Sequence, residues 1–538
     1  MEPPGDNVNI VHGEMSIVSR KIFSRQQKIL SSFRYFNATA AVRTTSNIYY
    51  KKKTTLKDLA TEEPLSKTSA GGLTKLICTV GPSTHSPELI QQLVDHGMRV
   101  MRINCEQSTK EEMLERVQWL RLCQGLHGCY QKDPKRPPNL RSVMFDTSTE
   151  EHLKMAIEMD VDFVSIPFVN HSNDVEKIKQ KLLHFQQEFV DGTNSSTSNI
   201  LSSTNVPTIP KIIAKIQTSE ALMNFNEILH VSDGIMVGRS NLAKDIPMGV
   251  VRAQKKIIKN CNVSGKPVII ASQMLDSMID HTTPTRAEVS DIVNAVYDGA
   301  DCVMLSMESS HGKYPIESCS TLSSIARQAD MSYSEYTSNH RHYHHHHHHE
   351  EREDDHGYRG VGNGVGNVTS FRNDNGNDNG IKNDDYFSRG VWPAMTKAAV
   401  QQASYGKVDL IVVITSSGKT AEMLSAEKGQ VPIMAYVDNA KVGRQLSCHR
   451  GIWPVYGPIK NVMWTKKQKF ETNDSLRISK EKMDMLQHEL FMIRPKEAVI
   501  KAKELNLIQE GDTVLIVMSE PSSNVLGRTL TTRTARVK

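Results

Sequence analysis

The chain has 538 residues, enough for two or three domains and a sizeable core. Hydrophobic residues make up 38% and aromatic residues 6% of the sequence, so we expect an aliphatic core. A formal net charge of +5 is too small for this length to indicate a nucleic-acid-binding protein, and no apolar run is long enough to span a membrane. The eight cysteines include no Cys-x-x-Cys pair, which favours a reducing compartment and gives no zinc signal.

Residues 1–72 show no periodic apolar pattern and hold much of the excess positive charge. From Met15 to Lys57 there are ten Lys or Arg residues and no Asp or Glu. This composition is typical of a mitochondrial transit peptide, although three acidic residues precede it. A disordered basic extension is the alternative interpretation, and both remain open.

Residues 73–336 alternate short apolar runs with helical patterns. Near-continuous apolar runs are typical of parallel strands that are buried on both faces. Eight such runs, each followed by a helical segment, predict a (β/α)8 barrel with its active site at the carboxyl ends of the strands. The expected strands are residues 76–80, 99–104, 142–147, 163–168, 212–217, 234–239, 268–273 and 302–307.

Residues 337–389 are rich in His, Gly, Asn and Asp, which predicts a flexible low-complexity insert without a catalytic role. A second α/β domain is expected over residues 390–538. Its predicted strands are residues 409–415, 431–437, 451–457 and 512–519.

The most informative stretch of the chain is residues 265–315. An apolar run ends in Ser272 and Gln273, a Pro-Thr-Arg-Ala-Glu helix start follows, and a second apolar run ends in Ser306 and Glu308. This order of residue types closely resembles the signature around the active-site helix of the pyruvate kinase family. The sequences TKLICTVGPSTHS, MRINCEQ, KIQ and VGRSNLAKDIP also occupy the places of family motifs. The resemblance covers residues 74–535 except the insert, and it implies the family's barrel followed by its C-terminal α/β domain.

Several active-site positions of the family are retained. The resemblance implies that Lys215 neutralises the transferring phosphoryl group, which is what phosphoryl transfer needs from a strand-end ammonium group. It implies that Arg239 shapes the substrate pocket, and that Ser272 keeps the hydroxyl group that relays a proton. A further set corresponds to substrate- or phosphate-binding positions: Arg102, Ser240, Asn241, Thr285 and Arg286. Of these, Thr285 and Arg286 begin a helix, whose first amides bind anions readily.

The divalent-metal site of the family is not retained. Relatives hold Mg²⁺ or Mn²⁺ with a Glu and an Asp, and here those positions carry Gln217 and Asn241. Amide oxygens are acceptable ligands for hard cations, but they bring no charge. Losing one electrostatic contact in a transition state typically costs a factor of about 10²–10³ in rate, so we expect at least that loss here.

The monovalent-cation site is half altered. Asn104, Asp146 and Thr147 match the K⁺ ligands implied by the resemblance, whereas Glu106 takes a serine position. Gln107 replaces a histidine that helps to hold nucleotide. Whether Glu106 binds a cation or pairs with a nearby base is left open by the sequence.

Two further features bear on activity. The family inserts a lid domain after its third strand, whereas here Asp146 and Thr147 run directly into a predicted helix start, so no residues remain for a lid.

In the C-terminal domain, residues 415–422 match a phosphate loop that binds a sugar bisphosphate in some relatives. The residues of this effector loop are Thr415, Ser416, Ser417, Gly418, Lys419 and Thr420. A plain strand–helix turn is the alternative.

Three functional interpretations follow. The first is a pyruvate kinase relative with lost or impaired activity that binds ligands or modulates active relatives. The second is an active but atypical pyruvate kinase, and the third is a structural or assembly protein. The resemblance implies phosphoenolpyruvate and ADP or ATP as ligands, Mg²⁺ and K⁺ as cofactors, and a homo- or hetero-tetramer. A cytoplasmic location is expected, with mitochondria as the alternative from the basic segment.

Overall fold

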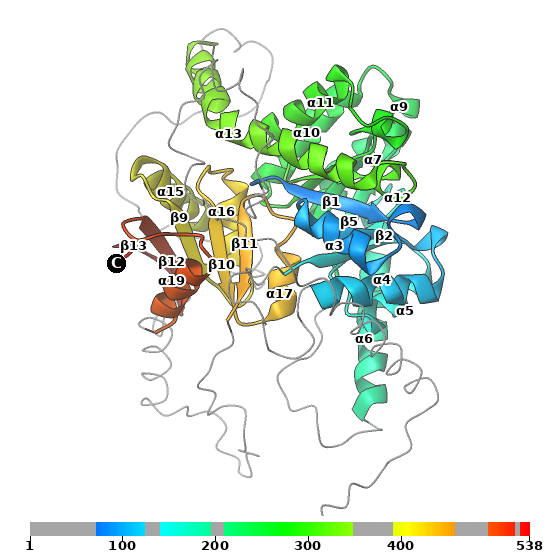
Figure 1. Ribbon diagram of the computed structural model, residues 1–538, viewed down its shortest axis with the longest axis horizontal. Coiled ribbons are helices and arrows are strands. Elements are labelled where there is room, and N and C mark those ends of the chain that lie inside the picture. The colour runs from blue at the N-terminus through cyan, green and yellow to red at the C-terminus, as the bar shows by residue number, and fades with distance from the viewer. Residues whose placement is uncertain (1–71, 124–139, 195–208, 348–390, 458–492, 522–527) are drawn as a thin grey trace, which may run out of the picture. The chain divides into compact units, whose positions relative to one another are not determined.

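The computed structural model describes residues 72–123, 140–194, 209–347, 391–457, 493–521 and 528–538 (Figure 1). All of them belong to one compact unit, Thr45–Lys538. The predicted N-terminal extension and most of the predicted insert lie outside the described residues. No helix in the described ranges is both long and apolar enough to cross a membrane.

Eight parallel strands close into a barrel in the order in which they occur in the chain, which confirms the predicted fold. Each expected run forms a strand whose residues are almost all buried, because both faces of the sheet are covered. The strands are β1 (Lys75–Val80), β2 (Met98–Asn104), β3 (Ser142–Asp146), β4 (Phe163–Ile166), β5 (Lys211–Ile216), β6 (Gly234–Gly238), β7 (Val268–Ala271) and β8 (Cys302–Leu305).

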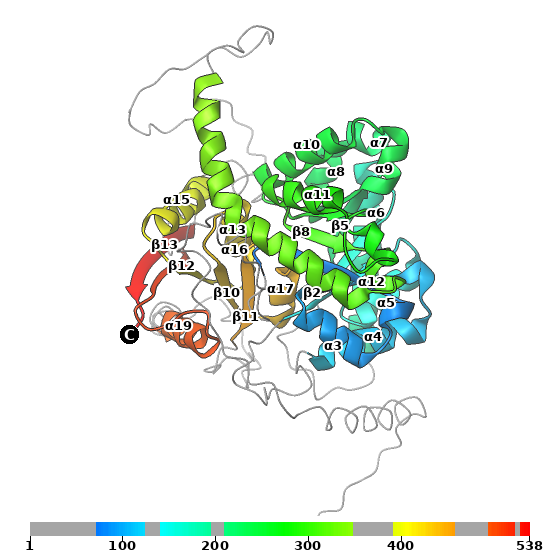
Figure 2. The ribbon, with the colours of Figure 1, turned by 45° about the horizontal axis from the view of Figure 1, so that its top comes forward.

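Helices cover the outside of the barrel (Figures 1 and 2). They are α3 (Pro87–Asp95), α4 (Lys110–Cys123), α5 (Glu150–Glu158), α6 (Ser172–Asn194), α7 (Ser219–Met223), α8 (Phe225–Val231), α9 (Arg239–Asp245), α10 (Val250–Val263), α11 (Arg286–Tyr297), α12 (Met307–Ser310) and α13 (Pro315–His347). Short 3-10 turns lie at η2 (Pro82–Thr84), η3 (Cys105–Gln107) and η4 (Asp276–Ile279). Helix α13 continues into the first residues of the predicted insert.

The C-terminal domain is a five-stranded mixed sheet in the order β11-β10-β9-β12-β13. Its strands are β9 (Leu410–Ile414), β10 (Ile433–Val437), β11 (Ile452–Tyr456), β12 (Thr513–Pro521) and β13 (Arg528–Arg536). Helices α15 (Val391–Tyr405), α16 (Lys419–Ala426) and α17 (Ala440–Gln445) contribute to the core on one face, and α19 (Arg494–Glu504) packs on the other. The sequence interpretation missed β13, which pairs antiparallel with β12.

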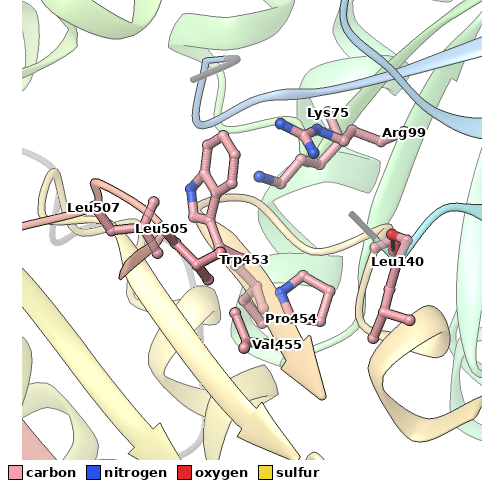
Figure 3. Close-up of a pocket in the computed structure, with 10 residues that line it drawn as sticks. Lys75, Arg99, Leu140, Trp453, Pro454, Val455, Leu505 and Leu507 are labelled. Carbon is pink, nitrogen blue, oxygen red and sulfur yellow. Dashed lines mark hydrogen bonds between the residues drawn. The ribbon is translucent and has the colours of Figure 1, made fainter. Parts of the chain in front are cut away.

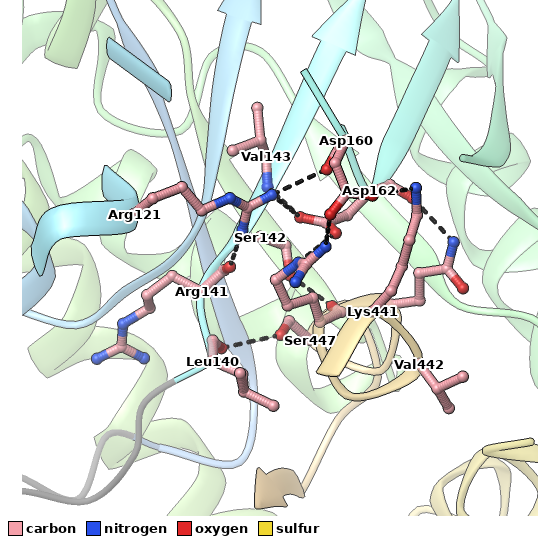
Figure 4. A network of polar contacts seen from close by, with 12 residues as sticks. Arg121, Leu140, Arg141, Ser142, Val143, Asp160, Asp162, Lys441, Val442 and Ser447 are labelled. Atoms are coloured by element: carbon pink, nitrogen blue, oxygen red, sulfur yellow. Dashed lines mark hydrogen bonds and ion pairs between the residues drawn. The ribbon is translucent and has the colours of Figure 1, made fainter. Parts of the chain in front are cut away.

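The C-terminal domain packs against the amino-terminal end of the barrel. The apolar cluster inside the barrel includes Cys448 from the turn after α17, and the thiol group of Cys302 donates to its carbonyl oxygen (3.2 Å). Polar contacts between the two domains centre on Arg444, which bonds Asp160 and Asp162 of the loop before β4. Figure 4 shows the two aspartates of this network with Lys441, which also pairs with Asp160. The predicted site residues lie at the opposite end of the barrel from these contacts.

Candidate functional site

The predicted site residues of the barrel gather at the carboxyl ends of its strands. Asp146 ends β3 and accepts hydrogen bonds from Arg102 of β2 and from Lys215 of β5 (3.1 Å to Oδ2 from the lysine Nζ). The hydroxyl group of Ser165 donates to Oδ1 (2.7 Å). Four neighbouring strands thus contribute to one buried cluster of two cations, a carboxylate and a hydroxyl group.

The charges in this cluster compensate one another. Burial by itself would raise the pKa of Asp146, but Arg102 and Lys215 outweigh it and lower the pKa to about 2. Burial and the nearby Arg102 lower the pKa of Lys215 below its usual value, with Asp146 opposing them. Because both carboxylate oxygens already accept hydrogen bonds from cations, the arrangement does not fit a K⁺ ion held by Asp146. Glu106 lies exposed in η3.

Gln217 follows β5 and is almost buried, with 6% of its surface exposed. Its Oε1 accepts the backbone N–H of Phe168 (3.0 Å), a residue with φ of 50°. A non-glycine residue in this region carries strain, so the amide holds a strained turn at the end of β4. A Cβ atom on Gly238 would lie 2.7 Å from Cγ of Gln217, so this side-chain position depends on glycine at the end of β6.

Asn241 lies in the first turn of α9, and its Oδ1 accepts from Nζ of Lys244 (3.3 Å). Both divalent positions are therefore neutral amides with protein donors on their oxygens. Within the described ranges, no three His, Cys, Asp or Glu side chains gather where they could hold a metal ion. The donor set does not fit the Mg²⁺ ion that the resemblance implied, and we derive no chemical step through such an ion.

The guanidinium group of Arg239 holds the end of β7 in place. Its guanidinium donates to the carbonyl oxygens of Ser272 (3.1 and 2.5 Å) and Gln273 (2.8 Å), and it pairs with Asp291 of α11. Ser272 and Gln273 both have positive φ, 70° and 54°. Consecutive strained residues persist only where the surroundings fix them, and here Arg239 does so. This orients Ser272 at the mouth of the barrel.

The predicted helix start at Thr285 forms a capping box. Thr285 accepts the N–H of Glu288 (3.3 Å), and the Glu288 carboxylate accepts the N–H of Thr285 (2.7 Å). The same carboxylate also accepts from the N–H and hydroxyl groups of Ser277 in η4. Thr285 and Arg286 are exposed beside this turn, and Ser240 is half-buried in α9.

Helix α5 begins four residues after the end of β3. Only Thr147, Ser148 and Thr149 connect the two elements, and Thr147 is buried with its hydroxyl group 3.1 Å from Nδ1 of His152. The connection between β3 and α5 therefore holds no inserted domain.

The loop at residues 415–420 is a compact turn. Thr415 accepts the N–H of Gly418 (3.0 Å), and Gly418 caps α16 with φ of 82°, which favours glycine. The hydroxyl group of Ser416 donates to Asp438 (2.8 Å), which places a carboxylate beside the loop and disfavours a phosphate group there. Ser417 and Lys419 are exposed, and Thr420 is buried.

Two residues of the site were not anticipated from the sequence. Ser165 bonds Asp146, and Asp291 pairs with Arg239. The sequence held a signal for Ser165, because it is a polar residue inside the apolar run FVSI. Asp291 lies on a helix among other polar residues, so the sequence gave no signal that it belongs to the site.

Comparisons with known proteins agree with this fold. Residues 195–319 match the family model of the pyruvate kinase barrel domain, and residues 393–537 match that of the pyruvate kinase alpha/beta domain. Pyruvate kinases of Clostridium acetobutylicum and Clostridium perfringens are each 31% identical to the chain, over 398 and 408 residues. These alignments cover 73% and 75% of this chain and 64% and 68% of the relatives.

The pyruvate kinase of Kluyveromyces lactis is 26% identical over 524 residues, covering 82% of this chain and 92% of the relative. The C. acetobutylicum alignment spans a little less than two thirds of that protein's length. Both domains of the family match in the same order, and the relatives align with most of the chain. The chain belongs to the pyruvate kinase family.

Proposed function

We propose that this pyruvate kinase-like protein is impaired or inactive in phosphoryl transfer, and that it acts by binding ligands of the family or by modulating active relatives. The observation that carries the proposal is Gln217, whose amide oxygen accepts the N–H of Phe168 where relatives are expected to have a charged metal ligand. At the second metal-ligand position, the neutral Asn241 likewise stands where relatives are expected to have a charged residue. Phosphoryl transfer depends on metal ions that neutralise the developing charge, and two neutral amides supply little attraction for them.

The connection from β3 to α5 supports the same proposal. Lid closure excludes water and completes a transfer site, and three connecting residues leave no room for a lid domain. Arg102 and Lys215 remain at the barrel mouth as cations, so binding of phosphoenolpyruvate is retained more readily than transfer to ADP.

The test compares the wild-type protein with the Gln217→Glu, Asn241→Asp double variant. Mn²⁺ binding is measured by calorimetry, and pyruvate formation from phosphoenolpyruvate and ADP is measured with Mg²⁺ and K⁺ present. We expect the double variant to gain Mn²⁺ affinity, because two carboxylates are restored, and to remain without kinase activity, because the lid is absent. Gln187→Glu, which adds a charge at an exposed position of helix α6, is the matched control and should leave Mn²⁺ affinity unchanged.

Wild-type turnover at ordinary kinase rates, of about 1–100 per second, would overturn the proposal in favour of an active, atypical enzyme. A double variant that gains both Mn²⁺ affinity and kinase activity would show that the missing acids alone limit the reaction. If neither phosphoenolpyruvate nor ADP raises the melting temperature of the wild-type protein, the structural or assembly interpretation is favoured instead.

For the cellular role, we propose a cytoplasmic protein that forms homo-tetramers or mixed tetramers with active pyruvate kinases. Sedimentation of the full chain, alone and mixed with an active relative, tests this assembly. A monomer under both conditions contradicts it. The mitochondrial alternative rests on the basic segment from Met15 to Lys57, which lies outside the described residues.

A further inference from the structure

The turn between α17 and β11 joins the C-terminal domain to the barrel through three consecutive buried residues. The first, Cys448, belongs to the apolar cluster inside the barrel. The third, Arg450, donates its backbone N–H to Oδ1 of Asp301 directly before β8 (2.9 Å). The turn leads into β11, whose Trp453 ring lies 4.7 Å from Nζ of Lys75 of β1 (Figure 3). A change of charge at the middle residue of this turn therefore acts on the domain junction.

That middle residue is His449, and its surroundings suit a neutral ring. Only 3% of its surface is exposed, and its Nε2 atom has no hydrogen-bond partner among the described residues. Oε1 of Glu422 on α16 lies 3.8 Å from Nε2, beyond hydrogen-bond distance. An imidazolium ion here would bury a full charge with its Nε2–H donor unpaired, whereas a neutral imidazole avoids most of that cost.

The charged groups around His449 already compensate one another in pairs that cross the junction. Glu422 pairs with Lys211 of β5. Lys428, which follows α16, pairs with Asp301 (2.6 Å). These two carboxylates and two ammonium groups all act on the His449 ring. Their charges cancel, so a proton on His449 would add a buried charge that no group is left to compensate.

The titration of these groups agrees with the geometry. Burial lowers the pKa of His449 from 6.5 to about 4, and the two lysines add to this effect while the two carboxylates oppose it. Burial by itself would raise the pKa of Glu422, but Lys211, His449 and Lys419 outweigh it and lower that pKa to about 2. Glu422 therefore stays ionised over the pH range in which His449 takes up its proton.

We propose that His449 is a pH-sensitive latch of the domain junction, which holds the C-terminal domain on the barrel when its ring is neutral and weakens this docking when the ring is protonated. Separation of the domains exposes the ring to water, which solvates the imidazolium ion. Between pH 6.5 and about 4, the ring thus binds more protons in the separated state than in the docked state. By linkage, docking is at full strength above this range and weakens by up to about tenfold per pH unit as the pH falls.

The test measures how fast Cys448 of the full chain reacts with 4,4′-dithiodipyridine, a disulfide that reacts with thiols in mild acid. Cys448 is completely buried, so the reagent reaches it only when the domains separate. Cys105 in η3, which is also buried but lies at the opposite end of the barrel, is the internal reference. Peptide mass spectrometry gives the ratio of the two labelling rates. We expect this ratio to rise about tenfold in the wild-type protein between pH 7.5 and pH 5.5.

Two variants separate the latch from a general effect of acid. In His449→Gln the ratio should stay nearly constant, because the glutamine amide is neutral at both pH values. His171→Gln is the matched control, since His171 is largely exposed and pairs with Glu220 (3.1 Å). This variant should retain the tenfold rise of the wild-type protein.

A ratio that does not change with pH in the wild-type protein, or an equal rise in wild type and His449→Gln, would overturn the proposal. Should His449→Gln fail to fold, hydrogen–deuterium exchange at the imidazole C2 position gives the titration midpoint of His449 in the wild-type protein. A midpoint at or above pH 6.5 contradicts the latch, and a midpoint near pH 4 supports it. Kinase activity is not needed for these measurements, so the outcome is independent of the function proposed above.

Discussion

Asp146 is the residue on which the charge balance of the barrel mouth depends. It is 6% exposed and is the shared partner of Arg102 and Lys215. Two buried cations that share one carboxylate lose their compensation together when that carboxylate is removed. The residue is therefore structural as well as part of the candidate site.

We predict that Asp146→Asn lowers the free energy of unfolding by about 3–5 kcal/mol, the usual cost of removing one partner of a buried ion pair. The pKa of Asp146 is about 2 in the folded protein, below its ordinary value of 3.8, so its contribution is present above pH 3.8 and is lost as the pH falls towards 2. Urea denaturation of wild type and variant across this pH range measures both effects. Their difference should shrink on acidification.

Asp280→Asn is the control for this experiment. Asp280 pairs with Lys313 at the surface, where both side chains are mostly exposed, so little change is expected. Equal losses in the two variants would contradict the role assigned to Asp146.

At the scale of elements, strand ends and helix starts decide where the site residues lie. The end of β7 is strained and is held by Arg239, and α11 begins in a capping box that also ties down η4. These contacts fix Ser272 and the start of α11 at one end of the barrel. A substitution at the start of α11 should therefore destabilise this end of the barrel.

We predict that Thr285→Ala destabilises the protein by about 1 kcal/mol, because it removes the side-chain acceptor at the start of α11. Thr285→Ser should retain most of the stability, since serine caps equally well. Thr283→Ala, in the same exposed loop, is the control and should be near neutral. The midpoints of urea denaturation give the comparison, and a neutral Thr285→Ala would show that the capping box is not stabilising.

At the scale of the whole molecule, buried ion pairs join the C-terminal domain to the barrel (Figure 4). Arg444 bonds Asp162, which is completely buried and also pairs with Arg121 (3.1 Å) and accepts the N–H of Val143 (2.9 Å). Lys211 of β5 pairs with Glu422 of α16 in the same way. The junction therefore depends on charges that are costly to leave unpaired.

We predict that Arg444→Met destabilises this junction by about 3 kcal/mol, near the lower end for a broken buried pair because Arg121 still compensates Asp162. The two domains should then melt in separate calorimetric transitions. Lys501→Met, which breaks only a pair within α19, is the control and should leave the calorimetric profile unchanged. Unchanged calorimetry for Arg444→Met would contradict a role of the network in joining the domains.

Much of the fold follows from the sequence, because buried parallel strands leave a local signal. The eight apolar runs of the barrel each became a strand, with bounds shifted by a few residues. Strand β13 was missed because its residues RTLTTRTAR are mostly polar, and those from Thr531 to Arg536 are mostly exposed. No apolar run therefore marks this antiparallel edge strand. The roles proposed for the site residues came from the resemblance rather than from any local pattern, and they stay predictions.

The sequence by itself determined the family, the barrel with its C-terminal domain, the direct step from β3 to α5 and the neutral residues Gln217 and Asn241, because each is a matter of residue type and order. Only the tertiary structure decided how these residues are used. In the folded protein the carboxylate of Asp146 accepts hydrogen bonds from Arg102 and Lys215, and Lys75 packs against Trp453 of the other domain. Such pairings join residues that are far apart in the chain, and the burial that sets their charge states arises only when the strands and domains pack together.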